Sequence, residues 1–437
     1  MKGPLDLSSA SIPSLEIRGS AARLPRLDSS NGILFVLLAL ALVRGLLYAV
    51  LSPPFDGPDE SAHLQYVAYL ATNGRAGPIG PEGHQPVGYY ALMVPAYWLT
   101  VGQPADIQLL AVRIASIPFL LGMVLFTWLA ARKMSPGSAF VPVVAAGFVA
   151  LQPALAYIGA SANNDNAANL MGAILTYLVV LLLSGKPRRW VAPVTAVAVG
   201  VAILTKGQIL PIVAISAAVL TVRIVTGAHQ LGWTKLLLYV AAPVLVAAAL
   251  LARRAGERML EMSTTSASML VNWSAAWHMV QQSNPQETFR VQFITFWTAY
   301  LAGTVHPAAA WYYALGAVIL LAAIGYALRL AGRGAPPHRS AVLLRVALLG
   351  MLLGVWLAAY LLFLYMFQDP SFPWRMAVIQ GRYLHVAIAP LALLVGEGWS
   401  LLAPSRIRAA AGWGILTLMA AFDVASLAVL VGHYAWR

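Results

Sequence analysis

Long apolar runs alternate with short polar segments along most of the chain. Eleven of these runs approach or exceed the roughly 20 residues that a helix needs to cross the hydrocarbon core of a membrane. Their approximate ranges are 32–52, 107–131, 138–159, 164–183, 190–205, 208–226, 232–252, 308–329, 342–366, 383–403 and 407–431. The two runs that meet at Thr205–Gln208 form either a tight hairpin or one broken helix. The pattern predicts an all-α, polytopic membrane protein with about 11 transmembrane helices.

Basic residues lie mostly in the short links between the runs, and the positive-inside rule places these links in the cytoplasm. They are Arg132, Lys133, Lys186, Arg188, Arg189, Lys235, Arg329, Arg333, Arg339, Arg345, Arg406 and Arg408. Residues 1–31 are then a cytoplasmic tail, and residues 32–437 form a single transmembrane domain. Three longer loops, 53–106, 253–307 and 367–382, face the opposite side. Within the first loop, the apolar segment 86–100 is short and contains Pro95, which favours an interfacial helix over a span.

The composition supports this class and excludes others. Of the 437 residues, 60% are hydrophobic and 10% are charged, whereas a soluble globular protein carries about 25% charged residues. The net charge of +13 is spread over the links, so nucleic-acid binding is not expected. The chain has no cysteine, which excludes disulfides, thiolate metal sites and a cysteine nucleophile. It also lacks a Walker motif and a nucleophile elbow.

Several ionisable residues follow the first span. Asp56-Gly57-Pro58-Asp59-Glu60 is typical of a helix start, with Pro58 at the first helical position and the acids near the positive end of the helix dipole. The helix is expected to end near Asn73-Gly74. Asp59, His63 and Tyr66 then share one face. At this point a capped interfacial helix and a catalytic site fit the residues equally well.

Two further groups lie at the same side of the membrane. Asn164 and Asp165 begin a span, where a carboxylate is costly unless it is paired or faces water. They form either a turn and helix cap or a second acidic site for a cation or an acceptor hydroxyl. Lys206 and Arg382 lie at the outer membrane boundary, where snorkelling is the simpler explanation. The guanidinium of Arg382 also has the shape to bind a phosphate, and His385 follows it by one turn.

These motifs resemble those of the GT-C membrane glycosyltransferases, a superfamily that includes protein O-mannosyltransferases and aminoarabinose transferases. The matching segments are Asp59-Glu60-Ser61-Ala62-His63, His84-Gln85-Pro86-Val87-Gly88-Tyr89-Tyr90, Asn164-Asp165, Leu204-Thr205-Lys206 and Gln380-Gly381-Arg382-Tyr383. They occur in the order seen in a bacterial branch of predicted glycosyltransferases and cover most of the chain. The sequence departs at Pro86-Val87-Gly88, where the family often has Pro-Pro-Leu.

The resemblance implies that the transmembrane domain is catalytic. It would transfer a hexosyl or pentosyl group, with inversion, from a polyprenyl-phosphate donor to a hydroxyl on the extracytoplasmic face of a bacterial inner membrane. The acceptor would be a cell-envelope glycan, lipid or protein. The implied roles are general base for Asp59, support for Glu60 and His63, a second acidic or acceptor site for Asp165 with Asn164, and donor-phosphate binding for Arg382 and Lys206. The implied cavity lining is His84, Gln85, Tyr89, Gln380 and Tyr383.

A divalent cation, Mg²⁺, Mn²⁺ or Ca²⁺, is a further expectation that the sequence leaves open. Asp59, His63 and Asp165 are its possible ligands, although hard cations usually take more oxygen donors. Two other functions also stay open. A transporter or flippase of lipid-linked glycans would favour repeated halves, which the sequence lacks. A polysaccharide polymerase or ligase would favour arginines in the outer loops over an acid-rich first loop.

Overall fold

The structure is a computed structural model that describes residues 29–77, 79–83, 85–185, 188–227, 285–298, 300, 304–331, 339–366 and 380–435. Within these residues the chain forms helices and no strands. The predicted tail up to residue 28, the predicted span 232–252, His84, and most of the loops 253–307 and 367–382 lie outside the described residues.

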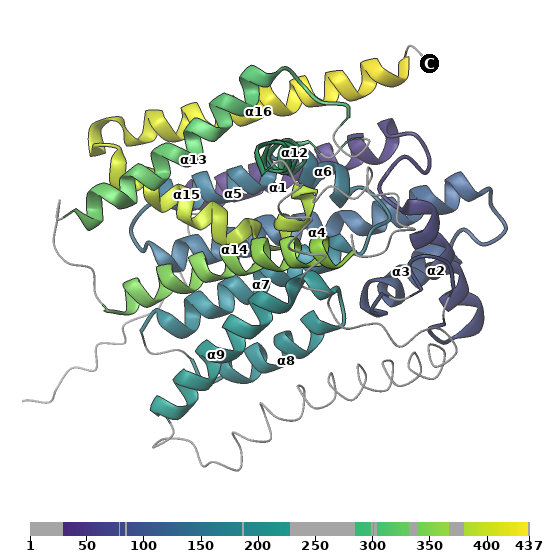
Figure 1. Cartoon of the computed structure of the whole chain (residues 1–437), viewed down its shortest axis with the longest axis horizontal. Coiled ribbons are helices and arrows are strands. Elements are labelled where there is room, and N and C mark those ends of the chain that lie inside the picture. The colour runs from purple at the N-terminus through teal and green to yellow at the C-terminus, as the bar shows by residue number, and fades with distance from the viewer. Residues whose placement is uncertain are drawn as a thin grey trace, which may run out of the picture.

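Long helices run side by side through the molecule (Figure 1). They are α1 (Ser29–Leu51), α4 (Ala105–Met134), α7 (Asp165–Leu183), α9 (Leu210–Gly227), α13 (Ala309–Leu330), α14 (Arg339–Met366), α15 (Ile388–Leu402) and α16 (Ser405–Ala435). The described residues hold 8 helices that are long and apolar enough to cross a membrane, or 9 if one bent pair counts as a span. The fold class is as predicted, while the count of about 11 is not confirmed, because the predicted span 232–252 lies outside the described residues. The predicted span 190–205 is only the short helix α8 (Val191–Ile203).

The predicted span 138–159 is two helices, α5 (Phe140–Ala150) and α6 (Pro153–Gly159), bent by 57°. Pro153 has no N–H to continue the hydrogen-bond ladder of α5, so the helix breaks before it. Such a break frees carbonyl groups, which need partners inside a membrane. Arg44 of α1 donates to the carbonyl of Ala150 and forms a bidentate ion pair with Asp423 of α16. These contacts join three helices at the break.

Two short helices, α2 (Glu60–Asn73) and α3 (Gly88–Trp98), lie against α4 at one end of the bundle (Figure 1). The predicted start of α2 at Pro58 is wrong, because Asp59 has a left-handed backbone with φ 58° and the helix begins at Glu60. At and just beyond the end of α3, Trp98 and Leu99 are exposed. An apolar face of this kind fits the expected interfacial helix.

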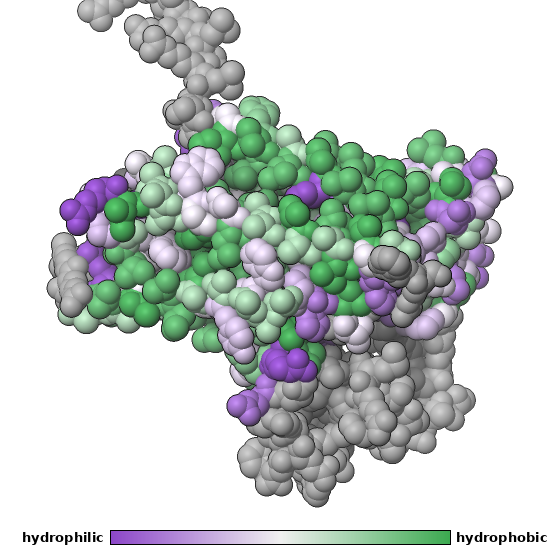
Figure 2. Space-filling model, turned by 90° about the horizontal axis from the view of Figure 1, so that it is seen from above, coloured by the Kyte–Doolittle hydropathy of each residue, from purple (hydrophilic) through white to green (hydrophobic). Residues whose placement is uncertain are grey.

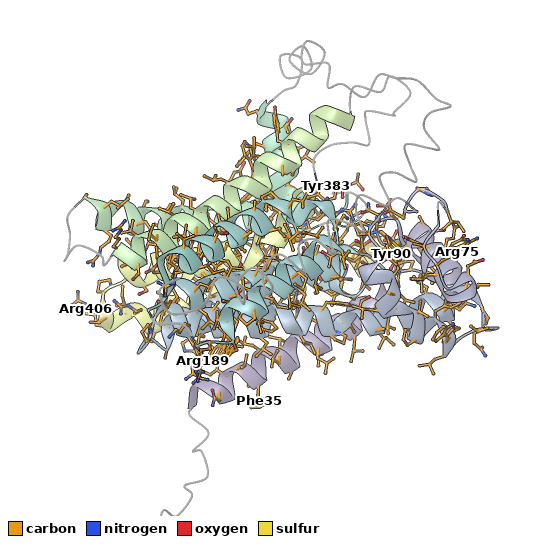
Figure 3. The ribbon with its side chains drawn as sticks, turned by 90° about the horizontal axis from the view of Figure 1, so that it is seen from below. Phe35, Arg75, Tyr90, Arg189, Tyr383 and Arg406 are labelled. Carbon is orange, nitrogen blue, oxygen red and sulfur yellow. The ribbon has the colours of Figure 1, made fainter. Side chains whose placement is uncertain are left out.

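Charged side chains lie at both ends of the bundle. Arg189 and Arg406 lie at one end, while Tyr90, Tyr383 and Arg75 lie at the other (Figure 3). The side surface between the ends is mostly hydrophobic, with hydrophilic residues gathered toward both ends (Figure 2). This distribution fits a multi-pass membrane protein whose helices cross the bilayer along their length.

Candidate active site

Arg382 occupies the centre of the candidate site. It lies at the start of the 3₁₀ helix η5 (Gly381–Ala387) and its side chain is 4% exposed. Its Nη2 lies 3.5 Å from Oδ2 of Asp59, and its Nη1 lies 3.7 Å from Oδ2 of Asp165. Within the described part of the chain, Nε and Nη1 have no hydrogen-bond partner. A buried guanidinium with unused donors is suited to bind an anion.

Lys206 is the second cation of the site. It lies in the break between α8 and α9, just before the short helix η1 (Gly207–Ile209). Its Nζ lies 2.5 Å from Oδ1 of Asp165 and 5.8 Å from the ring centre of Tyr383. The guanidinium carbon of Arg382 lies 5.1 Å from the same ring. Tyr383 therefore contacts both cations, and Asp165 is an ion-pair partner of both.

Two glycines allow the backbone approaches that place these cations. A Cβ on Gly381 would lie 2.0 Å from the carbonyl oxygen of Gln292 in α12 (Pro285–Trp297). The N–H of Gly381 also donates to Oγ1 of Thr295, 2.6 Å away. A Cβ on Gly88 would lie 2.5 Å from the carbonyl oxygen of Leu204, which accepts the Gly88 N–H at 2.9 Å. The contact of Gly381 holds the neighbouring Arg382 against α12. The contact of Gly88 holds Leu204, two residues before Lys206, against the start of α3.

Glu60 has its carboxylate fully occupied by protein groups. The guanidinium of Arg113, on α4, donates to Oε1 at 2.8 Å and to Oε2 at 2.6 Å. The N–H groups of Gly57 and Ala162 also donate to it, each at 3.1 Å. Glu60 thus connects the loop that carries Asp59 to the link between α6 and α7. In the sequence, Arg113 is a single arginine inside an apolar run. An ionisable side chain in such a position usually has a buried partner or a function.

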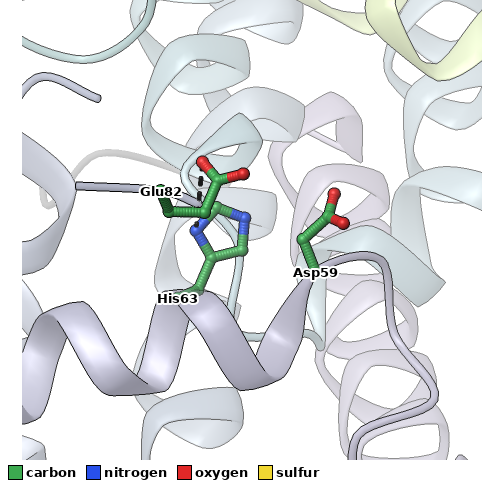
Figure 4. Close-up of side chains that lie close together, drawn as sticks. All are labelled: Asp59, His63 and Glu82. Atoms are coloured by element: carbon green, nitrogen blue, oxygen red, sulfur yellow. Dashed lines mark ion pairs between the residues drawn. The ribbon is translucent and has the colours of Figure 1, made fainter. Parts of the chain in front are cut away.

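Asp59, His63 and Glu82 lie close together (Figure 4), and Asp59 also contacts Arg382. Each offers one ligand atom, and these atoms all lie within 4.8 Å of one another. The His63 ring is buried, and its Nδ1 lies 2.9 Å from the hydroxyl of Tyr90 and 4.0 Å from Oε2 of Glu82. Burial, and then the charge of Glu82, raise the pKa of Tyr90, so its hydroxyl stays protonated at neutral pH. Asp165, which the sequence suggested as the third metal ligand, pairs with Lys206 instead.

The remaining predicted site residues lie in several different environments. Tyr89 is fully buried and its hydroxyl lies 2.9 Å from Oγ of Ser116. Gln85 is half-buried and its carbonyl accepts the Tyr66 hydroxyl at 3.4 Å. The carbonyl of Gln380 accepts the N–H of Tyr383 at 3.1 Å.

Two buried polar groups adjoin the centre of the site. Asn164 is fully buried just before α7, and its amide has no hydrogen-bond partner among the residues that the structure describes. His385 was expected to face the same cavity as Arg382. It is fully buried, with Nε2 at 2.8 Å from the carbonyl oxygen of Phe296 in α12. Asn164 therefore belongs to the polar surroundings of Asp165, and His385 contacts the backbone of α12.

No protein-family model matches the sequence, and no curated protein matches it either. Solved structures do match. ArnT from Cupriavidus metallidurans in the apo state aligns with a TM-score of 0.50 and 17% identity, over 93% of this chain and 78% of that one. ArnT bound to undecaprenyl phosphate aligns with a TM-score of 0.49 and 17% identity, over 92% and 77%. The Archaeoglobus fulgidus oligosaccharyltransferase aligns with a TM-score of 0.49 and 13% identity, over 91% and 56%. The chain therefore has the fold of ArnT, which is the GT-C fold that its motifs implied.

Proposed function

We propose that the protein is a membrane glycosyltransferase that moves a sugar from a polyprenyl-phosphate donor to a hydroxyl of an acceptor, with inversion at the anomeric carbon. The observation that carries the proposal is the position of Arg382, which contacts both Asp59 and Asp165 beside Lys206. The fold shared with apo ArnT supports the same class of enzyme.

The position of the site along the bundle agrees with a lipid-linked donor. Tyr383 lies at the end of the bundle opposite to Arg189 and Arg406 (Figure 3). Because the basic links between the predicted spans, which include Arg189 and Arg406, are expected to face the cytoplasm, we assign the site to the extracytoplasmic side of a bacterial inner membrane. A polyprenyl phosphate presents its phosphate at headgroup depth. An acceptor hydroxyl of a cell-envelope glycan, lipid or protein can reach the site from the same side.

The two cations suit the donor phosphate. The Nε and Nη1 atoms of Arg382 have no hydrogen-bond partner in the described residues, and a guanidinium can donate two parallel hydrogen bonds to phosphate oxygens. Lys206 is held by Asp165 on one side and by the Tyr383 ring on the other. The phosphate gains negative charge as it leaves the sugar, so cations fixed in advance stabilise the transition state.

Asp59 suits the role of general base. Its side chain is 57% exposed, whereas that of Asp165 is 3% exposed and paired with Lys206. In a single displacement, the acceptor oxygen attacks the anomeric carbon and its proton passes to the Asp59 carboxylate. The bond between the anomeric carbon and the phosphate oxygen breaks, and its electron pair stays on the phosphate. Attack from the face opposite to the phosphate inverts the configuration.

The test uses the full chain in lipid nanodiscs with a panel of polyprenyl-phosphate hexoses and pentoses. We expect release of free polyprenyl phosphate with at least one donor when a hydroxyl-bearing acceptor is present, and inversion in the product by NMR. The Asp59→Asn variant should lose this release. The matched control is Asp106→Asn, because Asp106 is an exposed acid at the start of α4. Full activity of Asp59→Asn, or retention of anomeric configuration, would contradict the mechanism.

A further inference from the structure

We infer that Tyr157 and Asn163 are positioning residues for Asp59, and that their side chains hold the loop before α2 in the conformation that presents the Asp59 carboxylate to the site. The role of Asp59 as general base rests on the proposed function, whereas the hold on the loop does not. Tyr157 lies in α6 and Asn163 lies in the link to α7. Neither is among the site residues that the sequence motifs implied.

The loop before α2 has an unusual backbone. Phe55 and Asp59 both lie in the left-handed region, with φ of 65° and 58°. Residues other than glycine rarely adopt this conformation, and it persists where the surrounding structure imposes it. The side chain of Asp59 is 57% exposed and does not cap α2. The groups that impose its backbone conformation therefore act on the neighbouring residues of the loop.

Two buried side chains bind carbonyl groups of this loop. The hydroxyl of Tyr157 donates to the carbonyl of Asp56 at 3.1 Å and lies 3.3 Å from Oδ2 of the same residue. Nδ2 of Asn163 donates to the carbonyl of Pro58 at 3.0 Å. That carbonyl belongs to the peptide group that joins Pro58 to Asp59, and the orientation of this group sets φ of Asp59. The two hydrogen bonds therefore restrain the backbone that leads into the left-handed residue.

Tyr157 is itself fixed by a buried network inside the bundle. Its ring packs against the rings of Tyr300 and Tyr48, with centroids 5.0 Å and 6.4 Å away. The hydroxyls of Tyr48 and Tyr300 lie 2.6 Å apart, and Tyr48 also donates to Asp423 at 3.3 Å. Asp423 pairs with Arg44, which binds the free carbonyl at the end of α5. The network thus fixes the start of α6, and the Tyr157 hydroxyl is a fixed point to which the loop is bonded.

Asn163 connects the two carboxylates of the site. Its Oδ1 accepts the N–H of Asp165 at 2.8 Å, while its Nδ2 binds the carbonyl of Pro58. One buried amide thereby sets the loop of Asp59 against the start of α7, where Asp165 pairs with both cations. Asp59 lies 3.5 Å from Arg382, so a loop released from Tyr157 or Asn163 would carry its carboxylate away from that guanidinium.

The test uses the full chain in lipid nanodiscs and a single introduced thiol, because the sequence has no cysteine. The thiol of Asp59→Cys should have a pKa below the ordinary value of about 8.5, since the Arg382 guanidinium favours the thiolate. Adding Tyr157→Phe or Asn163→Ala should raise that pKa and slow alkylation at neutral pH by about threefold or more. The control Tyr313→Phe removes the hydroxyl of an exposed tyrosine on α13 and should leave alkylation unchanged. Thermal unfolding checks that each variant is folded, and Tyr157→Phe, which keeps the ring, serves if Asn163→Ala does not fold.

Sugar transfer by variants that keep Asp59 is the second measurement. Tyr157→Phe should transfer sugar more slowly by about tenfold or more, because a misplaced base reacts poorly, while the affinity for polyprenyl phosphate changes by less than about twofold. An ordinary thiol pKa in Asp59→Cys, or alkylation that Tyr157→Phe leaves unchanged, overturns the inference whatever happens to transfer. Where the unaltered chain turns over a donor, unchanged transfer in Tyr157→Phe overturns it as well. If the thiol responds as expected but no donor is turned over, the proposed function falls and the hold on the loop stands.

Discussion

The Nη2 atom of Arg382 lies 3.5 Å from Oδ2 of Asp59, although the two residues are 323 positions apart in the sequence. This contact joins the first loop of the chain to the segment that precedes α15. It brings an exposed carboxylate and a buried guanidinium to the same end of the bundle. In an inverting transfer the base and the phosphate-binding cation act on opposite sides of one sugar, so both belong to the same site and the pair is the basis of the predictions that follow.

Replacing Asp59 by Asn should separate binding from chemistry. The asparagine keeps the size of the side chain but cannot accept the proton of the acceptor hydroxyl. We expect the rate of transfer to fall by about 10²–10⁴-fold, with polyprenyl phosphate still bound. The measurement is single-turnover release of polyprenyl phosphate alongside lipid binding. A variant that transfers sugar at the original rate would show that Asp59 is not the base.

Replacing Arg382 by Lys should weaken donor binding even though the charge is kept. A lysine cannot reproduce the parallel hydrogen bonds of a guanidinium. We expect the affinity for polyprenyl phosphate to fall by about tenfold, which corresponds to about 1.4 kcal/mol. The control is Arg406→Lys at the opposite end of the bundle (Figure 3). Equal losses in the two variants would show that the effect is not specific to the site.

Breaking the pair between Glu60 and Arg113 should destabilise the protein more than changing an exposed acid. The side chains of Glu60 and Arg113 are 0% and 4% exposed, and removing one partner of a buried ion pair costs about 3–5 kcal/mol. We expect Glu60→Ala to lower the unfolding temperature clearly, with Asp106→Ala nearly unchanged. A double-mutant cycle with Arg113→Ala measures the coupling. A coupling near zero would show that the contact does not hold the first loop in place.

Replacing Gly381 by Ala should disturb the site without changing any charged group. The new Cβ would meet the backbone of α12 at 2.0 Å, so η5 must move and carry Arg382 with it. We expect weaker binding of polyprenyl phosphate and a lower unfolding temperature. Gly414→Ala is the matched control, because nothing lies within 4 Å of its Cβ position. Alanine there should keep or slightly raise the stability, since it favours a helix by about 1 kcal/mol.

The sequence by itself determined the class of the protein and the end of the bundle at which its polar motifs lie. Apolar runs of span length and basic links follow directly from the cost of placing charges in hydrocarbon. Four motif residues could be selected from the sequence: Asp59, Asp165, Lys206 and Arg382. Each lies at a predicted membrane boundary, where an ionisable side chain is costly unless it is paired or faces water. Their convergence at one place agrees with that choice.

Only the tertiary structure decided which groups are partners. Glu60 pairs with Arg113 of another helix, Glu82 joins Asp59 and His63, and Tyr89 turns into the packed interior. The left-handed conformation of Asp59 also depends on this context. Local patterns report how far each residue lies along its own helix, but they do not report which face of one helix meets which face of another. That choice depends on the packing of the whole bundle, including the backbone approaches at Gly88 and Gly381.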